Sequence, residues 1–463
     1  MKFLDTLRGL YIKSPNWLRQ GVSPALAILP INIKYGKTYT NLYKDIACSR
    51  NDAEFVREYQ VANLRNIAKL AAKTPYYKKI FVENSINPDA FTLADLQKLP
   101  ILDKNAIRQN SEAFLTKDIS QCDVSSTSGT SGQPLKFYMD KDRGVKEWAF
   151  VNTLWATAGY TPNDLRAVLR GVKLANPDDK PYDYNPALRE LRLSPFHLHP
   201  ETMDKYLQLI TQYKVKFIHG YPSAIDILAR HAHKTNWQKS PYLQGVLAVS
   251  ENLLQHQRCN IENAFGKVFP FYGMSEKVAI AGEIAKDIYE FEPLYGYTEL
   301  VDEQNNPVTE VGQQGRIIGT GFISTAMSLI RYDTGDYAEL LALPTYENGY
   351  RLRLRNIQSR WGQEFVVDKH GGLISIAAIN IHSSVYAKIR EFQIYQDVVG
   401  EAIVKIIPTP NVKKDELQPF IDEIQKKVGT GIAFKLEIVS EIAKNTRGKR
   451  KFISQQLNLQ DFQ

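Results

Sequence analysis

Apolar side chains recur at helical spacing over residues 51–75, and this periodicity predicts a helix there. The positions that share its apolar face are Phe55, Tyr59, Ala62, Leu64, Ile67, Leu70 and Ala71. A second helix is expected after Thr92, because leucines at positions 93, 96 and 99 repeat every three residues.

Short apolar runs alternate with helical patterns from about residue 145 to residue 320. Residues 216–220 and 245–249 have the composition of buried strands, whereas residues 204–213 and 223–233 have helical periodicity. Such alternation of strands and helices predicts a largely parallel sheet.

The pattern becomes rich in β-strands from residue 297 onward. Strands are expected at residues 299–301, 315–319 and 350–355. The segments 302–307 and 347–349 contain the Asp, Asn and Gly residues that favour turns.

A smaller unit is expected to begin near residue 360. Its predicted elements are strands near 364–367, 391–396 and 401–407, and a helix over 414–428. A chain of 463 residues is also too long for one compact core. The predicted fold class is therefore α/β. A large amino-terminal domain over residues 1–359 would combine parallel-rich sheets flanked by helices with a β-rich subdomain, and a small α+β domain would follow over residues 360–463.

The net charge is +8, from 58 basic and 50 acidic residues, which is a mild excess for this length. It suits an anionic substrate or a membrane surface as readily as nucleic acid. No basic stripe with interleaved stacking aromatics lies away from the amino terminus, so no nucleic-acid partner is expected. The three cysteines, Cys48, Cys122 and Cys259, are too few and too far apart for a disulfide framework or a cysteine zinc site.

The amino-terminal residues 1–50 are aromatic, basic and interrupted by proline. Two hypotheses fit this composition: a peripheral membrane contact at the inner membrane face, and a segment that packs on the main domain. We favour the second. The most apolar stretch, residues 22–33, is shorter than the roughly 20 residues of a membrane span, and no signal-peptide pattern is present, so the cytoplasm is the expected compartment.

The strongest local signal for chemistry is the hydroxyl-rich loop over residues 125–136, SSTSGTSGQPLK. Its two glycines tolerate positive φ, so hydroxyl and backbone N–H groups can converge on a polyphosphate. The alternative is a flexible linker, which rarely exits into an apolar strand as this loop does. The Walker-type pattern is absent, and Gly319-Thr320-Gly321 lacks the third glycine of a dinucleotide fingerprint.

Three further segments follow in order. Residues 271–276 (FYGMSE) offer an aromatic ring, a hydroxyl and a carboxylate, and residues 331–336 (RYDTGD) offer a carboxylate expected on a turn. Residues 446–449 (TRGK) place a lysine on a loop near the end of the chain. Each segment alone fits an ordinary turn or solvated loop, but their order and spacing together are specific.

This ordered set resembles the acyl-adenylate-forming enzyme superfamily, and within it the phenylacetate–CoA ligase-like branch and its CapK-like capsular polysaccharide subgroup. The resemblance covers nearly the whole chain. Its other supports are residues 11–36, 72–77 (AKTPYY), 99–104 (LPILDK) and 219–223 (HGYPS).

The resemblance implies a set of residues that bind the nucleotide. The β- and γ-phosphates of ATP would be held by the hydroxyl loop, which consists of Ser126, Thr127, Ser128, Gly129, Thr130, Ser131 and Gly132. Ser250 and Glu251 would lie against the adenine, and Tyr272, followed by Gly273, would stack on it. Asp336 would bind the ribose hydroxyls, and Arg360 matches the arginine that precedes the interdomain hinge.

The resemblance also implies the catalytic residues. Ser275 would contact the α-phosphate, Glu276 would hold Mg²⁺, and Lys449 would swing in from the small domain to bridge the α-phosphate and the substrate carboxylate. These roles are physically reasonable, because two anions must approach each other and positive charge where negative charge develops lowers that barrier.

The implied reaction is ATP-dependent activation of a small-molecule carboxylic acid, with transfer of the acyl group to an acceptor. The residues leave open whether the acceptor is coenzyme A or an amine of an amino acid or amino sugar, and they do not define the oligomeric state. The subgroup favours a role in surface polysaccharide biosynthesis. The segment after Arg360 reads Trp361-Gly362-Gln363-Glu364, without the acidic hinge of many relatives, and this weakens the expectation of a large domain rotation.

Three other interpretations bear on the site. A non-catalytic nucleotide-binding scaffold in a membrane-associated assembly is disfavoured by the presence of Glu276, Asp336 and Lys449. The His197/His199 and His231/His233 pairs are not expected to bind a metal, because helix neighbours two apart do not face each other.

His219 fits two roles equally: a lining residue of the acyl pocket, or a structural histidine with satisfied hydrogen bonds. The pocket itself is expected near residues 148–155, 219–223 and 272–280.

Overall fold

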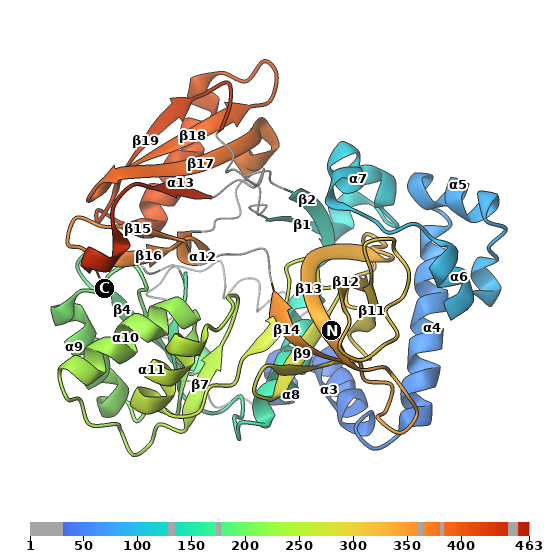
Figure 1. The fold of residues 1–463 in the computed structure, drawn as a ribbon, viewed down its shortest axis with the longest axis horizontal. Coiled ribbons are helices and arrows are strands. Elements are labelled where there is room, and N and C mark those ends of the chain that lie inside the picture. The colour runs from blue at the N-terminus through green and yellow to red at the C-terminus, as the bar shows by residue number, and fades with distance from the viewer. Residues whose placement is uncertain are drawn as a thin grey trace.

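Three units built on β-sheets surround the centre of the molecule (Figure 1). The structure is a computed structural model, and the residues it describes are 31–127, 135–172, 174, 177–358, 364–379, 384–442 and 452–462. The helices from α9 (Pro200–Gln212) to α11 (Gln255–Phe265) lie beside one sheet, and those from α3 (Ile31–Cys48) to α8 (Arg143–Ala156) lie beside a second. The carboxy-terminal unit stands above the first sheet (Figure 1).

The first unit is a five-stranded sheet with the strand order β4-β5-β3-β6-β7. Its strands are β3 (Arg166–Leu169), β4 (Tyr182–Asn185), β5 (Glu190–Leu193), β6 (Phe217–Gly220) and β7 (Gly245–Ala248). The helices of this unit are α9 (Pro200–Gln212), α10 (Pro222–Lys234) and α11 (Gln255–Phe265). Four neighbouring strands, β5, β3, β6 and β7, are parallel, so the prediction of a largely parallel sheet is confirmed.

The second unit is a seven-stranded antiparallel sheet with the order β11-β12-β13-β14-β10-β9-β8. Its strands are β8 (Phe271–Gly273), β9 (Ile280–Ala285), β10 (Ile288–Phe291), β11 (Gly296–Val301), β12 (Gln314–Gly321), β13 (Tyr332–Ala342) and β14 (Arg353–Gln358). The expected strand at 350–355 begins later, because Tyr350 has φ +55° and still belongs to the preceding turn.

The segment 331–336 was expected on a turn, and that expectation is wrong. It lies mostly inside strand β13, where the partners of Arg316 and Ile318 on β12 are Tyr337 and Asp333. This irregularity is a bulge, with Gly335 at φ +75°. A β-bulge changes the direction of the side chains next to it. A turn would have had the same effect on Asp336.

Helices and a hairpin cover the second sheet. They are α3 (Ile31–Cys48), α4 (Ala53–Ala71), α5 (Pro75–Glu83), α6 (Leu93–Lys98), α7 (Lys104–Gln109), α8 (Arg143–Ala156), β1 (Cys122–Thr127) and β2 (Leu135–Asp140). Short 3₁₀ turns occur at Pro88–Ala90, Ser111–Phe114, Ile119–Gln121, Pro186–Leu188, Ser384–Lys388, Lys414–Glu416 and Leu459–Phe462. The predicted helix over 51–75 is α4, and Thr92 caps α6 in a reciprocal capping box with Asp95.

Residues 31–48 pack on the main domain. In α3, the Tyr39 side chain is buried, and its hydroxyl accepts a hydrogen bond from Asn152 Nδ2 of α8 at 2.9 Å. This part of the amino-terminal segment therefore behaves as the packing hypothesis expects, whereas residues 1–30 lie outside the described residues. Along the described chain, the helices are all too short or too polar to serve as a membrane span.

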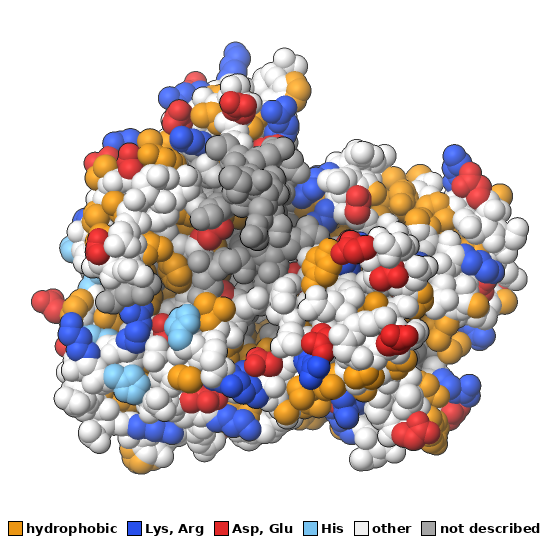
Figure 2. Space-filling view, viewed as in Figure 1, with side chains coloured by type: hydrophobic (Ala, Val, Ile, Leu, Met, Phe, Trp, Pro, Cys, Tyr) orange, Lys and Arg blue, Asp and Glu red, His pale blue; other side chains and the backbone are white. Residues whose placement is uncertain are grey.

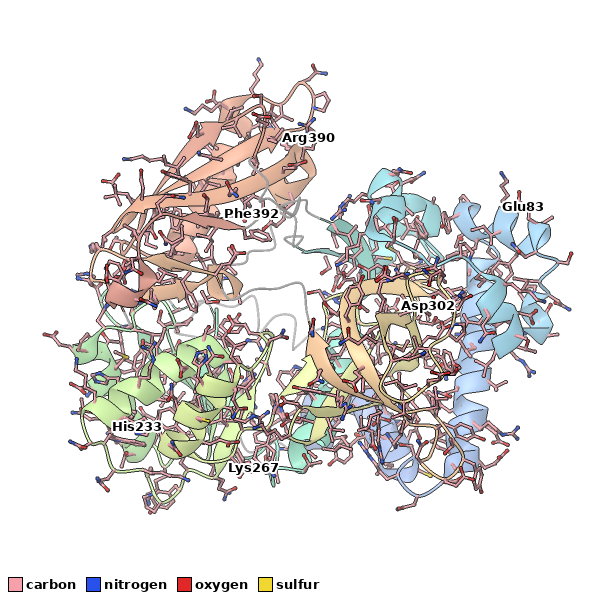
Figure 3. All side chains as sticks on the ribbon, in the orientation of Figure 1. Glu83, His233, Lys267, Asp302, Arg390 and Phe392 are labelled. Carbon is pink, nitrogen blue, oxygen red and sulfur yellow. The ribbon has the colours of Figure 1, made fainter. Side chains whose placement is uncertain are left out.

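The carboxy-terminal unit contains a four-stranded sheet in the order β19-β18-β17-β20. Its elements are β15 (Phe365–Val367), β16 (Leu373–Ser375), α12 (Ile376–Ile379), β17 (Ile389–Val398), β18 (Glu401–Pro408), α13 (Gln418–Val428), β19 (Ala433–Ile438) and β20 (Ile453–Gln455). On β17, the ring of Phe392 is buried with its centroid 5.3 Å from that of Phe420 and 5.2 Å from that of Phe452 (Figure 3).

The carboxy-terminal unit and the five-stranded sheet share one continuous hydrophobic core. Polar contacts join them as well: His199 Nε2 lies 3.3 Å from Asp368 Oδ2, and Asp178 Oδ1 accepts the Thr430 N–H at 3.1 Å. His231 of the second histidine pair lies 2.7 Å from Asp204. These histidines thus contact carboxylates of neighbouring elements.

Charged side chains of both signs are intermingled on the face shown in Figure 2. Among the described residues on this face, basic and acidic side chains are therefore interspersed.

Candidate active site

A cavity of about 980 Å³ lies where the three units meet. This volume is at the upper end of the range for small-molecule sites. The structure brings seven of the residues expected at the site into its lining: Ser250, Glu251, Tyr272, Gly273, Ser275, Glu276 and Asp336. Its lining also includes Trp148, Trp155 and His219, from two of the segments expected to form the acyl pocket.

One wall pairs an aromatic ring with a carboxylate. Tyr272, on β8, donates a hydrogen bond from its hydroxyl to Asp336 Oδ2 at 2.9 Å. Asp336 stands at the bulge of β13, where its own N–H donates to Thr334 Oγ1 at 3.1 Å. Burial, followed by the Asp336 charge, raises the pKa of Tyr272, so the phenol stays protonated. A flat ring beside a carboxylate is a surface that suits a base and a ribose diol.

Glu276 is a buried carboxylate held by two donors. Tyr332 donates its hydroxyl to Glu276 Oε1 at 2.5 Å, and Lys104 Nζ lies 3.4 Å from the same oxygen. Burial opposes ionisation, but the Lys104 charge and the Tyr332 hydrogen bond outweigh it and lower the pKa of Glu276. The carboxylate is therefore ionised although its residue is only 6% exposed.

Lys104 is a site residue that the sequence reasoning did not assign. It begins helix α7, which Asp103 caps by accepting the Ala106 N–H at 2.8 Å. The signal was available in the segment 99–104, which served only as a support for the resemblance. Its lysine lines the cavity and forms an ion pair with Glu276.

Glycines on two strands allow the segment after Glu276 to lie close against the sheet. A Cβ atom on Gly296 would meet the Val278 carbonyl oxygen, and one on Gly321 would lie 2.6 Å from the Lys277 carbonyl oxygen. A Cβ atom on Gly319 would lie 2.8 Å from the Val278 side chain. The pair Gly319 and Gly321, which is not a dinucleotide fingerprint, therefore has a packing role that positions Ser275 and Glu276.

Glu251 connects two units. Its carboxylate accepts the Ser223 N–H at the start of α10 at 3.0 Å and the Ser375 hydroxyl of β16. Burial is the largest effect and raises the pKa of Glu251 in spite of these hydrogen bonds. Ser250, just before it, has φ +68° at the end of β7 and is exposed to the cavity.

Several expected site residues fall outside the part of the chain that the structure describes. Ser126 and Thr127 end strand β1, paired with Lys136 and Leu135 of β2. The remainder of the hydroxyl loop, Ser128 to Gly132, lies outside the described residues, as do Arg360 and Lys449. Their roles stay predictions.

The described residues do not gather three or more metal-binding side chains in one place. Mg²⁺ in nucleotide sites is commonly held by one or two carboxylates together with phosphate oxygens and water. A single ionised carboxylate that lines the cavity, as Glu276 does, fits that donor set.

The arrangement of a large α/β region, a β-rich sheet and a small carboxy-terminal unit around one cavity is the fold of the adenylate-forming ligases. Solved structures of 2-hydroxyisobutyryl-CoA ligase show this likeness. The complex with 2-HIB-AMP and CoA in the thioesterification state has a TM-score of 0.54 at 18% identity, covering 88% of this chain and 91% of that chain. The post-adenylation complex with 2-HIB-AMP has a TM-score of 0.52 at 20% identity, covering 87% and 89%.

Sequence comparison places the chain near CapK. Residues 366–456 match the family model of the CapK C-terminal domain. Protein CapK of Staphylococcus aureus is 24% identical over 90% of this chain and 92% of its own length. Phenylacetate-coenzyme A ligase of Aromatoleum evansii is 26% identical over 64% of this chain and 69% of its own length. The resemblance stated from the sequence is thus confirmed, and the comparisons support an enzyme of the AMP-forming ligase class.

Proposed function

We propose that this protein activates a carboxylic acid with ATP and transfers the acyl group to an acceptor. A carboxylate oxygen attacks the α-phosphorus, pyrophosphate leaves, and an acyl adenylate forms. The nucleophile of the acceptor then attacks the acyl carbonyl carbon, and AMP leaves. The observation that carries this proposal is the convergence of Tyr272, Asp336, Ser275 and Glu276 on one cavity that the carboxy-terminal unit also lines.

The residues of the cavity would divide the work. Tyr272 and Asp336 would bind the nucleoside, and Ser275 would contact the α-phosphate. Glu276 would hold Mg²⁺, which supplies positive charge to the phosphates when it is bound. Lys449 would bridge the α-phosphate and the attacking carboxylate, and holding the two reactants in line would supply much of the acceleration.

We propose coenzyme A as the acceptor to test first. The support is that several relatives are named as CoA ligases and that one solved neighbour contains both an acyl adenylate and CoA. An amine of an amino acid or amino sugar is the alternative. The resemblance to the CapK-like subgroup supports a role in surface polysaccharide biosynthesis, with the reaction carried out in the cytoplasm.

The domain boundary belongs to the same proposal. Residues 1–359 would form the AMP-binding domain and residues 360–463 a mobile lid with Lys449. The match of residues 366–456 to one family model supports a separate carboxy-terminal module. Closure of such a lid would keep water from the mixed anhydride.

The test is ATP–pyrophosphate exchange with Mg²⁺ against a panel of carboxylic and amino acids. Wild-type protein should exchange label in the presence of one acid class, and Lys449→Ala should lose exchange while still binding ATP. Lys444→Ala, which removes another lysine five residues earlier in the chain, is the matched control and should keep exchange. Asp336→Ala should instead weaken ATP binding itself. ATP binding without exchange for any acid would favour the scaffold alternative.

A further inference from the structure

Three nitrogen-bearing side chains line the cavity and are not among the residues assigned to the nucleotide. They are Arg170, just after β3, His219 on β6, and Lys427 on α13 of the carboxy-terminal unit. The tryptophans Trp148 and Trp155 of α8 line the same cavity. None of these three side chains has a role in the proposed nucleotide site.

His219 is buried without hydrogen bonds. Its residue is 1% exposed, and neither ring nitrogen has a hydrogen-bond partner among the described residues. Its ring centroid lies 4.7 Å from that of Trp155 in an edge-on contact. The interpretation as a satisfied structural histidine is therefore wrong. Burial, followed by the charges of Arg170 and Arg166, lowers the pKa of His219, so the ring is neutral and offers one N–H donor and one acceptor.

An unsatisfied buried polar group costs about 1–3 kcal/mol. Such a cost is tolerated in a folded protein when a ligand supplies the missing partner. Because His219 lines the cavity, the partner it lacks in the protein is expected on a molecule that occupies the cavity.

Arg170, whose charge acts on His219, also lies close to Lys427 of the carboxy-terminal unit. Burial and the charge of Arg170 lower the pKa of Lys427 to about 8. A Cβ atom on Gly171 would lie 3.2 Å from Lys427 Nζ and 2.9 Å from the Ala378 carbonyl oxygen, so the glycine permits this close approach. Arg170 forms no ion pair with any described carboxylate, and its side chain interacts with the Tyr221 hydroxyl.

Three further carboxylates line the cavity, those of Glu147, Glu251 and Asp287, and the first two are already engaged. Glu147 forms an ion pair with Lys277 at 2.5 Å, and Glu251 accepts from Ser223 and Ser375. A negative charge between Arg170 and Lys427 would relieve their repulsion, because opposite charges at short range in a desolvated site attract strongly. An N–H of His219 could complete the set of donors.

We propose that Arg170, His219 and Lys427 bind a second anionic group of the acyl substrate, at a distance from the carboxylate that is activated. The substrate would then be a dicarboxylic acid, or a carboxylic acid with a comparable second anion, whose carbon skeleton lies against Trp148 and Trp155. The inference rests on the proposed acid activation and defines its substrate class.

Binding can be measured without turnover, because two of the five tryptophans of the chain line the cavity. Intrinsic fluorescence would be titrated with matched acids that differ in one carboxylate: succinate against butyrate, glutarate against valerate, and phthalate against benzoate. At least one dicarboxylate should bind about tenfold more tightly than the matched monocarboxylate, as expected for a desolvated charge pair. Arg170→Met and Lys427→Met should each abolish that preference.

Lys426→Met is the matched control, because Lys426 is exposed on the same helix and does not line the cavity. It should leave the preference unchanged. No dicarboxylate preference in any pair, or a preference that survives both Arg170→Met and Lys427→Met, would overturn the proposal. An effect of these variants confined to the KM of the acceptor, with acid binding unchanged, would also overturn it.

The same acids would then be tested in ATP–pyrophosphate exchange, which separates this inference from the proposed function. Dicarboxylate binding that depends on Arg170 but supports no exchange would support the anion site and contradict the proposed activation. The opposite result is exchange that is equally fast with a monocarboxylate and with the matched dicarboxylate, and that does not change in Arg170→Met. That result would support activation and overturn the anion site.

Discussion

Glu276 illustrates how single residues set the charge of this site. Its carboxylate is buried and nevertheless ionised, because Lys104 and the hydroxyl of Tyr332 both stabilise the anion. Neither partner is near Glu276 in the sequence. A carboxylate held in this way is ready to accept a cation without first losing a proton.

Removing the Tyr332 hydroxyl tests this arrangement. A hydrogen bond to a charged group contributes about 1.5–3 kcal/mol, so Tyr332→Phe should lower kcat/KM for ATP–pyrophosphate exchange by roughly tenfold or more. The loss should appear mainly in the dependence on Mg²⁺ and ATP. Tyr337→Phe, on the same strand, is the control, because its exposed hydroxyl donates to Glu303. Equal activity of the two variants would contradict the role given to Tyr332.

His219 also predicts a pH dependence of stability. Burial, and then the charges of Arg170 and Arg166, lower the pKa of His219 well below 6.5. The unfolded chain therefore binds a proton at a higher pH than the folded chain does. The free energy of unfolding should be fully maintained above about pH 6.5 and should fall as the pH decreases below that value.

Urea unfolding at a series of pH values from about 8 down to about 5.5, on either side of the ordinary histidine pKa, would measure this effect. His219→Phe cannot bind that proton, so its midpoint should fall less steeply with decreasing pH than the wild-type midpoint. Identical pH slopes for the two proteins would contradict the assignment of the effect to His219.

At the scale of elements, glycines in β11 and β12 decide how closely the loop that carries Ser275 and Glu276 can lie against the sheet. Gly321→Ala would place a methyl group 2.6 Å from the Lys277 carbonyl oxygen. We expect a loss of about 1–3 kcal/mol in the free energy of unfolding, together with reduced exchange activity, because backbone atoms must move.

Gly144→Ala is the control for this prediction. Gly144 lies in helix α8, and a methyl group added there would meet no atom within 4 Å beyond its chain neighbours and the nearby backbone of its own helix, so the substitution should leave stability unchanged or slightly increase it. Chemical denaturation and pyrophosphate exchange of both variants would decide the matter. A Gly321→Ala protein with wild-type stability would mean that the loop is not held by this close approach.

Elements with strong periodicity were predictable from the sequence. The helix α4 and the strands β6 and β7 lie where apolar spacing and burial indicated, because local patterning dominates there. Strand β13 was not recognised at its start, since the Asp and Gly residues that mark a turn form a bulge in this context. Pairing with β12 and β14 overrides the local preference for a turn.

The site was predictable only to the extent that its residues lie in recognisable segments. Tyr272, Glu276 and Asp336 were expected together, and they line one cavity. Lys104 and Arg170 were not assigned, because their importance depends on neighbours that are distant in the sequence. Lys427 comes from the carboxy-terminal unit, from which only Arg360 and Lys449 were expected at the site. Its place in the cavity depends on how that unit docks, which no local sequence pattern encodes.

At the scale of the whole molecule, Glu251 joins the five-stranded sheet to the carboxy-terminal unit. Its carboxylate accepts hydrogen bonds from Ser223 and from Ser375, and the two units share a hydrophobic core. Ser375→Ala should remove the polar link and leave the apolar contacts. The loss of one hydrogen bond to a charged group, about 1.5–3 kcal/mol, should weaken docking of the two units without unfolding either.

Hydrogen exchange of backbone amides would report this weakening. Amides of β16 should exchange roughly tenfold faster or more in Ser375→Ala, whereas amides in the centre of β18 should be unaffected, because local opening need not involve the rest of the unit. Ser454→Ala is the control, since its hydroxyl accepts a hydrogen bond from Gln456 within the carboxy-terminal unit. If the unit must undock from Glu251 for acyl transfer, Ser375→Ala should also change the ratio of adenylate formation to transfer. Unchanged protection of β16 would show that the apolar core alone holds the two units together.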